Sequence, residues 1–271
     1  MKQTMEQLEV AGLPISFVRA GEGPPLVLLH GFAGDSREWR AEIDDLSADF
    51  TVVAWDAPGA GQSADPPEWF LMADYADCLA GLIRGLGIAR AHVVGLSFGG
   101  ALALALYELA LYERHPEIPE TLVLASAYAG WTGSLPKDIA DERLRLSLQL
   151  ADSGPDQFVR AMNPTLFPRS ADPEKVAAFG AIMAEFHPRG FSVMARSLAE
   201  ADLREVLPRV DVPTLLLYGE DDVRAPRSVA EGLHSGIRGS WLEMLPGLGH
   251  MINIEAPDLF DAAVRSFIAP G

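Results

Sequence analysis

Five short apolar runs, none of which alternates with polar residues, constrain the fold of this chain more than any other feature. They lie at residues 26–30, 51–55, 92–95, 121–125 and 214–218. Runs of this length without alternation are typical of strands that are covered on both faces, as in a parallel sheet. Helix-like stretches lie between them, at 36–46, 70–86 and 98–114. This order predicts an α/β protein with a doubly wound, mostly parallel sheet, opened by a hairpin at 8–20.

One long interval, residues 131–204, has no strand-like run. It contains only helical patterns and holds five of the twelve Phe and three of the eight Met. Because structureless loops of this length are rare in a compact domain, we expect an inserted helical cap at 131–204. The α/β core would then comprise 1–130 and 205–271. The apolar side chains that we expect to bind substrate are Trp131, Phe158, Met162, Phe186 and, outside this interval, Met251.

The composition indicates a globular protein with few kinds of partner. Of 271 residues, 49% are hydrophobic, and the net charge of −17 disfavours nucleic acid and anionic membranes as partners. Cys78 is the only cysteine, which excludes a disulfide framework and a cysteine-rich metal site. The first residues lack a signal-peptide pattern and the longest apolar run, 101–107, is too short to span a membrane. We therefore expect a cytoplasmic protein that acts on a small molecule.

The G-x-S-x-G pattern at Gly95, Ser97 and Gly99 is the strongest indication of chemistry. It follows an apolar run and opens a helix-like stretch, which is the setting of a nucleophile elbow. Such a turn strains the serine backbone, and the flanking glycines remove the side chains that would clash there. The N-terminus of the next helix offers N–H groups to an oxyanion. We predict that Ser97 is a nucleophile; the alternative is an inert serine in a glycine-rich turn.

A serine nucleophile needs a base that is held by a third group. Among the six histidines, His30 ends a predicted strand and His92 begins one, so both are interpreted as structural. His250 lies in a glycine-rich loop between a short predicted strand at 241–244 and the last predicted helix. This position predicts that His250 is the base.

The acid is expected directly after the preceding strand, because the chain order on such a sheet is serine, acid, histidine. The run at 214–218 is followed by Glu220, Asp221 and Asp222. Glu220 is the least favoured of the three. Asp221 and Asp222 stay open as alternatives on position alone.

Four sequence blocks make the chain resemble the α/β-hydrolase fold superfamily, in particular its small, capped, metal-free esterases and lactonases. The blocks are HGF at 30–32, DAPGAGQS at 56–63, the elbow around Ser97, and GEDDVRAP at 219–226 together with Gly249 and His250. They are spread over nearly the whole chain. One departure is Ala60, where the superfamily usually has a second histidine.

The resemblance implies roles for further residues. The superfamily pattern G-x-x-D-x-x-x-P, counted from Gly219 to Pro226, makes Asp222 the acid. The backbone N–H groups of Phe32 and Phe98 would form the oxyanion hole. No metal ligand and no cofactor is expected.

These features predict a metal-independent serine hydrolase that cleaves a small carboxylic ester or lactone with an apolar acyl part through an acyl-enzyme. A carboxylesterase and an N-acyl-homoserine-lactone-type lactonase both fit. One alternative is hydrolysis of an enol lactone or of a carbon–carbon bond, whose carboxylate could bind Arg160 or Arg196 of the predicted cap. A hydrolase-fold small-molecule sensor is an alternative from a different class.

Overall fold

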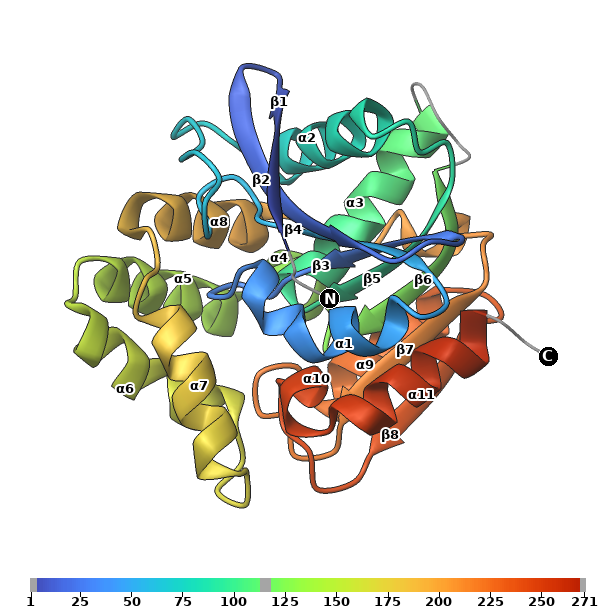
Figure 1. Cartoon of the computed structure of the whole chain (residues 1–271). Coiled ribbons are helices and arrows are strands. Elements are labelled where there is room, and N and C mark those ends of the chain that lie inside the picture. The colour runs from blue at the N-terminus through green and yellow to red at the C-terminus, as the bar shows by residue number, and fades with distance from the viewer. Residues whose placement is uncertain (1–3, 113–117, 269–271) are drawn as a thin grey trace.

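A computed structural model describes residues 4–112 and 118–268. Its eight strands form one sheet in the order β1-β2-β4-β3-β5-β6-β7-β8 (Figure 1). Strand β2 pairs antiparallel with β1 and β4, and all the other neighbours are parallel. The predicted α/β class is confirmed. The strands are β1 Met5–Val10, β2 Leu13–Ala20, β3 Pro25–Leu29, β4 Thr51–Trp55, β5 Ala91–Leu96, β6 Pro119–Ala125, β7 Thr214–Gly219 and β8 Trp241–Leu245.

The five apolar runs form the middle of this sheet as β3 to β7. Every residue of β5 and of β7 is buried, which explains why these strands do not alternate. The opening hairpin turns at Ala11 and Gly12, whose φ angles are 51° and 80°. Positive φ at both positions matches a two-residue turn to the twist of its strands.

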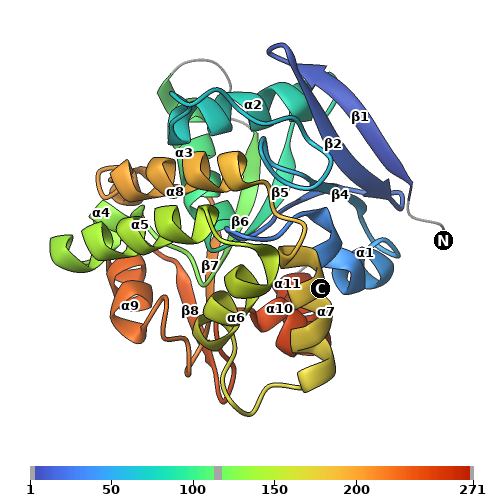
Figure 2. The same ribbon diagram turned by 90° about the vertical axis from the view of Figure 1, so that its left-hand side faces the viewer.

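Helices cover both faces of the sheet, as a doubly wound fold requires. Helix α1 packs against α11 on one face, and α2 packs against α3 on the other (Figures 1 and 2). The bounds are α1 Arg40–Leu46, α2 Met72–Gly85, α3 Phe98–Tyr112, α9 Arg227–Gly236 and α11 Pro257–Ile268. The predicted helix at 98–114 is described as far as Tyr112, and its last two residues lie outside the described residues. No helix in the described ranges is long and apolar enough to cross a membrane.

Five α-helices lie between β6 and β7 and form a group beside the sheet (Figure 2). Helix α5 packs on α8, and α6 packs on α7. Pro155, Pro173 and Pro188 are the first residues of helices, where proline removes no helical hydrogen bond. The division into core and cap at 131–204 stays a prediction. The α-helices of this group are α4 Trp131–Ser134, α5 Lys137–Ala151, α6 Pro155–Leu166, α7 Pro173–Met183 and α8 Pro188–Glu200. The remaining short elements are η2 Leu207–Arg209, which follows α8, and η1 Ser36–Trp39 and α10 Ile252–Glu255 in the other parts of the chain.

Candidate active site

Ser97 lies in the sharp turn between β5 and α3. Its φ of 54° is in the left-handed region, where a residue with a side chain is strained. The two flanking positions have no room for a side chain. A Cβ on Gly95 would overlap the backbone of Gly99, and a Cβ on Gly99 would overlap the carbonyl group of Leu29. Close packing of backbone against backbone therefore holds the serine at the end of β5.

Hydrogen bonds of the backbone fix this turn. The N–H of Ser97 donates to the carbonyl of Ala125 at 2.8 Å, and the carbonyl of Ser97 accepts from the N–H of Ala101 at 3.1 Å. In residues 4–112 and 118–268, the N–H groups of Phe32 and Phe98 have no acceptor. Phe32 lines the same cavity as Ser97, and Phe98 is the residue directly after Ser97 in the chain. Both N–H groups are therefore available to an oxyanion there.

His30 holds the loop that carries Phe32. Its Nε2 accepts from the N–H of Ala57 at 2.9 Å, and its Nδ1 lies 2.8 Å from the carbonyl of Gly31. The N–H of Gly31 donates to Glu38 Oε1 at 2.9 Å. Burial lowers the pKa of His30, so its imidazole stays neutral and Nδ1 carries the proton. These bonds suit the structural interpretation of His30.

Asp222 and His250 form a buried pair beside Ser97. His250 Nδ1 lies 2.8 Å from Asp222 Oδ2, and the two side chains are 2% and 0% exposed. The other carboxylate oxygen accepts from the backbone N–H groups of Arg224 at 2.8 Å and Ala225 at 2.9 Å. Because an ionised aspartate only accepts hydrogen bonds, Nδ1 carries the imidazole proton. The Nε2 atom is then left as the acceptor.

The other two acidic side chains of this loop lie elsewhere. Glu220 is exposed and accepts a hydrogen bond from Arg227 at 3.1 Å. Asp221 is also exposed. Of the three candidate acids, Asp222 is the one that contacts His250.

The pKa values of the pair are set by burial and by each other. Burial lowers the pKa of His250, and the charge of Asp222 offsets this only in part. Burial alone would raise the pKa of Asp222, but the charge and hydrogen bond of His250 and the N–H of Ala225 hold it below its ordinary value. At neutral pH the pair is therefore a carboxylate beside a neutral imidazole, the state that a general base requires.

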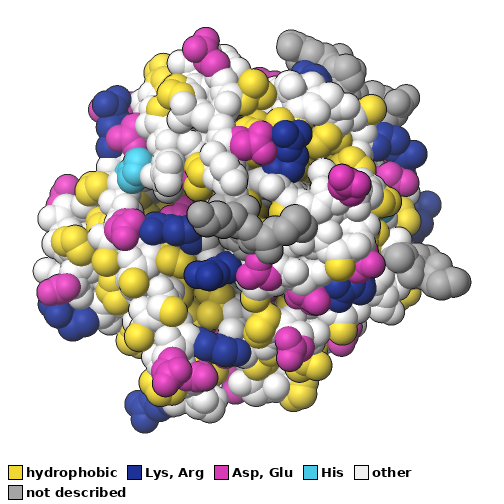
Figure 3. Space-filling model, viewed as in Figure 1, with side chains coloured by type: hydrophobic (Ala, Val, Ile, Leu, Met, Phe, Trp, Pro, Cys, Tyr) yellow, Lys and Arg dark blue, Asp and Glu magenta, His cyan; other side chains and the backbone are white. Residues whose placement is uncertain are grey.

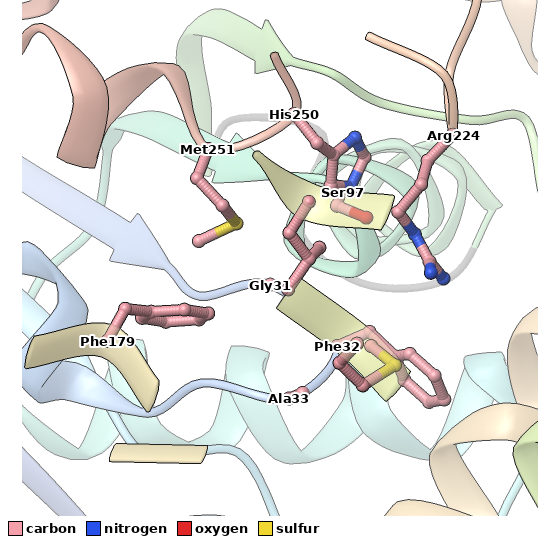
Figure 4. Close-up of a pocket in the computed structure, with 10 residues that line it drawn as sticks. Gly31, Phe32, Ala33, Ser97, Phe179, Arg224, His250 and Met251 are labelled. Atoms are coloured by element: carbon pink, nitrogen blue, oxygen red, sulfur yellow. The ribbon is translucent and has the colours of Figure 1, made fainter. Parts of the chain in front are cut away.

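A cavity of about 10 Å³ lies beside this pair, with room for one water-sized group. Figure 4 shows Ser97 and His250 between Arg224 on one side and Met251 and Phe179 on the other. Helices α6 and α7 contribute side chains to the lining, so the α4–α8 segment closes the cavity. The lining residues are Gly31, Phe32, Ala33, Ser97, Met162, Leu166, Phe179, Arg224, His250 and Met251.

The five side chains predicted to bind substrate divide into two groups. Two of them line this cavity, namely Met162 and Met251. The other three belong to an aromatic cluster behind Phe32, namely Trp131, Phe158 and Phe186. In this cluster the rings of Phe158 and Phe186 stack with centroids 4.0 Å apart. Phe186 also lines a second cavity of about 20 Å³, which shares Phe32 with the first.

Phe179 and Arg224 were not predicted from the sequence. Phe179 is one of many apolar residues on helices, and only tertiary packing decides which of them turn toward the site. Arg224 could have been found from a local signal, because it follows Asp222 by two residues in the loop at 219–226, which we call the acid loop. The arginines suggested for carboxylate binding, Arg160 and Arg196, are exposed and do not line the cavity.

A larger hollow lies on the outer side of Phe179. This outer groove, about 970 Å³ in volume, is formed by η1, α1, α7 and α10, and Phe179 lines both the groove and the small cavity. Its lining includes Arg37, Arg40 and Lys175. Figure 3 shows basic side chains along the middle of this face, with acidic side chains scattered around them. One aromatic side chain is thus common to the site and to an open groove.

No metal centre is indicated in the part of the chain that the structure describes. There, no group of three or more His, Cys, Asp and Glu side chains could hold a metal ion. What the described arrangement can do chemically is attack by a serine that is activated by a neutral histidine.

Comparisons with known proteins place the chain among hydrolases of the alpha/beta type. Residues 26–263 match the model of the alpha/beta hydrolase family. The chain is 33% identical over 258 residues to "Putative carbamate hydrolase RutD" of Pantoea ananatis, covering 90% of this chain and 87% of that protein. A thermophilic esterase from Thermogutta terrifontis, solved with malate bound, has 27% identity, a TM-score of 0.88 and 98% coverage of each chain. The enol-lactonase from Burkholderia xenovorans has 26% identity and a TM-score of 0.83, covering 97% of this chain and 99% of its own.

Proposed function

Because the chain belongs to the alpha/beta hydrolase family, we propose that it is a serine hydrolase with Ser97 as nucleophile, His250 as base and Asp222 as acid. The observation that carries this proposal is the buried His250–Asp222 pair, 2.8 Å apart, beside a serine in a strained turn. In this arrangement the acid controls the tautomer of the base and stabilises its cation.

The reaction proceeds in two steps. Ser97 Oγ attacks the carbonyl carbon while His250 Nε2 accepts its proton, and the N–H groups of Phe32 and Phe98 donate to the oxyanion. The alcohol leaves with the proton that His250 returns, and an acyl-enzyme remains. A water molecule that gives its proton to His250 then hydrolyses the acyl-enzyme. Asp222 stays ionised throughout and balances the charge of the imidazolium.

The substrate is a small carboxylic ester or lactone with an apolar part. The apolar side chains of Met162, Phe179 and Met251 in the cavity wall support an apolar part in the substrate. The names of two similar structures, an esterase and an enol-lactonase, support an ester or lactone. The curated relatives named for carbamate hydrolysis add carbamates as a further group to test.

Replacing the nucleophile tests the proposal. We expect Ser97→Ala to lower kcat/KM at least ~10³-fold on any substrate that the wild type cleaves, because it removes the attacking oxygen and little else. The substrates are 4-nitrophenyl esters of graded acyl length, a matching series of lactones, and carbamates. A fluorophosphonate should modify wild type at Ser97, as located by mass spectrometry.

Ser235→Ala is the matched control, since Ser235 is exposed on α9; it should keep wild-type rates. Near-wild-type turnover by a folded Ser97→Ala protein would reject the mechanism. Binding of these compounds without turnover would instead favour the small-molecule sensor.

A further inference from the structure

Arg224 places a positive charge in the catalytic cavity. It comes from the same loop as Asp222, is half-buried, and lines the cavity with Ser97 and His250. Figure 4 shows its side chain on the opposite side of Ser97 from Met251 and Phe179. A substrate carbonyl held at Ser97 would therefore have one substituent toward an apolar wall and the other toward a guanidinium.

The polar partners of Arg224 are neutral. One N–H of its guanidinium donates to Thr165 Oγ1 at 3.0 Å, and the hydroxyl of Tyr128 lies near it. The nearby carboxylate of Asp222 is already held by His250 and by two backbone N–H groups. Burial lowers the pKa of Arg224, and the nearby charge of Asp222 offsets this only in part.

A second arginine strengthens this positive site. Arg143 of α5 donates to the carbonyl of Arg224 and to the hydroxyl of Tyr128, both at 3.1 Å. Its guanidinium also lies over the rings of Tyr128 and Trp131, 5.7 Å and 5.5 Å from their centroids. Within the described ranges, neither arginine forms an ion pair with a carboxylate. Two adjacent unpaired cations in a chain of net charge −17 indicate a site for an anion.

We propose that Arg224 binds a carboxylate on the substrate, so that the preferred substrates are acidic esters or lactones. This inference rests on the proposed hydrolase function. A guanidinium presents parallel N–H donors that match a carboxylate, and it binds most strongly where water is excluded. Arg224 is then a specificity-determining residue. Arg143 is a positioning residue, because it holds the carbonyl of Arg224 and adds positive charge beside it.

Matched ester pairs test the inference with the hydrolysable group kept constant. For a carboxylate on the acyl side, mono-4-nitrophenyl adipate is compared with 4-nitrophenyl methyl adipate. For a carboxylate on the leaving side, 4-acetoxybenzoate is compared with its methyl ester. The quantity measured is the ratio of kcat/KM for the acidic member to kcat/KM for the neutral member. We expect wild type to favour the acidic member of at least one pair.

Variants of the arginines then distinguish the loss of a positive charge from a general loss of folding. We expect Arg224→Gln to lower this ratio by about fifty-fold, because a charge-assisted bond is lost in a dry site. Arg224→Lys, which keeps the charge without the planar fork, should lower it by about tenfold. Arg143→Gln should raise KM for the acidic member more than it lowers kcat, which a merely structural defect would not do. Arg160→Gln, on an exposed side chain, should leave the ratio at its wild-type value.

The outcomes distinguish this inference from the proposed function. If wild type cleaves both members of each pair equally and Arg224→Gln leaves the ratios unchanged, the carboxylate site is rejected while the hydrolase stands. If wild type cleaves no ester, lactone or carbamate and a fluorophosphonate does not modify Ser97, the proposed function itself fails. Adipate as an inhibitor of neutral-ester cleavage gives an independent measurement. Its Ki should rise in Arg224→Gln, and an unchanged Ki would count against the site.

Discussion

The two walls of the cavity at Ser97 and His250, which we propose is catalytic, are built in different ways. On the sheet side, backbone contacts hold the reacting groups, as in the overlap that requires Gly99 against Leu29 and the hydrogen bonds that hold Asp222. On the side of α6 and α7, the wall consists of the side chains Met162, Leu166 and Phe179. A wall held by backbone tolerates few changes in sequence, whereas a wall of side chains can change its shape residue by residue. We therefore expect the chemistry to depend on the first wall, and the choice among apolar parts of the substrate to depend on the second.

The acid loop gives the largest contrast within the sheet-side wall. We expect Asp222→Asn to lower kcat by about 10³–10⁴-fold, because the imidazole loses its tautomer control and the partner of its cation. Asp221→Asn should stay within about tenfold of wild type, since Asp221 is exposed. Steady-state rates on one activated ester are enough to compare the two.

Both changes remove one negative charge at neighbouring positions, so each controls for the other. A reversed order of damage would move the acid to Asp221. Equal, small effects would mean that the sheet-side wall does not supply the acid.

Phe179 tests the helical wall. Because its side chain lines both the small cavity and the outer groove of about 970 Å³, Phe179→Ala should join the two spaces. We expect kcat/KM for esters with acyl chains of eight or more carbons to rise about tenfold relative to acetyl esters. Ile182→Ala is the matched control, since Ile182 lines the groove but not the catalytic cavity. A large loss of kcat on every ester would contradict the contrast between the two walls, because the helical wall would then contribute to the chemical step.

The pH dependence of kcat/KM tests the smallest expected effect, which is that of the helical wall on the pKa of His250. Since burial holds the pKa of His250 below its ordinary value of 6.5, kcat/KM should fall only below pH 6.5. The sign follows from the base, because a protonated imidazole accepts no proton and activity is lost as pH falls through its pKa. Phe179→Ala should admit water and move this midpoint upward, while Ile182→Ala should not. A midpoint above 6.5 in the wild type would contradict this effect of burial.

Local backbone signals made the fold and the sheet-side residues predictable. The apolar runs identify the strands because both faces of the sheet are covered, and the glycines around Ser97 are required by steric overlap over a few residues. Asp222 and His250 follow neighbouring strands of one parallel sheet, β7 and β8, so strand order alone brings them to the same edge.

The residues that line the cavity on its helical side could not be predicted as fully from the sequence. Trp131 and Phe158 are as apolar as Met162, but the orientation of their helices places them in an aromatic cluster instead of the cavity. Arg160 is exposed for the same reason. The direction of Arg224 depends on contacts with Thr165 and Tyr128, which are far from it in sequence.

A backbone hydrogen bond joins the two walls at the base. The backbone N–H of His250 donates to the carbonyl of Leu166 at 2.9 Å. Leu166 is the last residue of α6, where a carbonyl has no partner within its own helix. Any motion that lifts this end of α6 to admit a substrate therefore also releases the main chain of the base. The C-terminal end of α6 and the main chain of the base are thus mechanically coupled, because neither can move away from the other without breaking this bond.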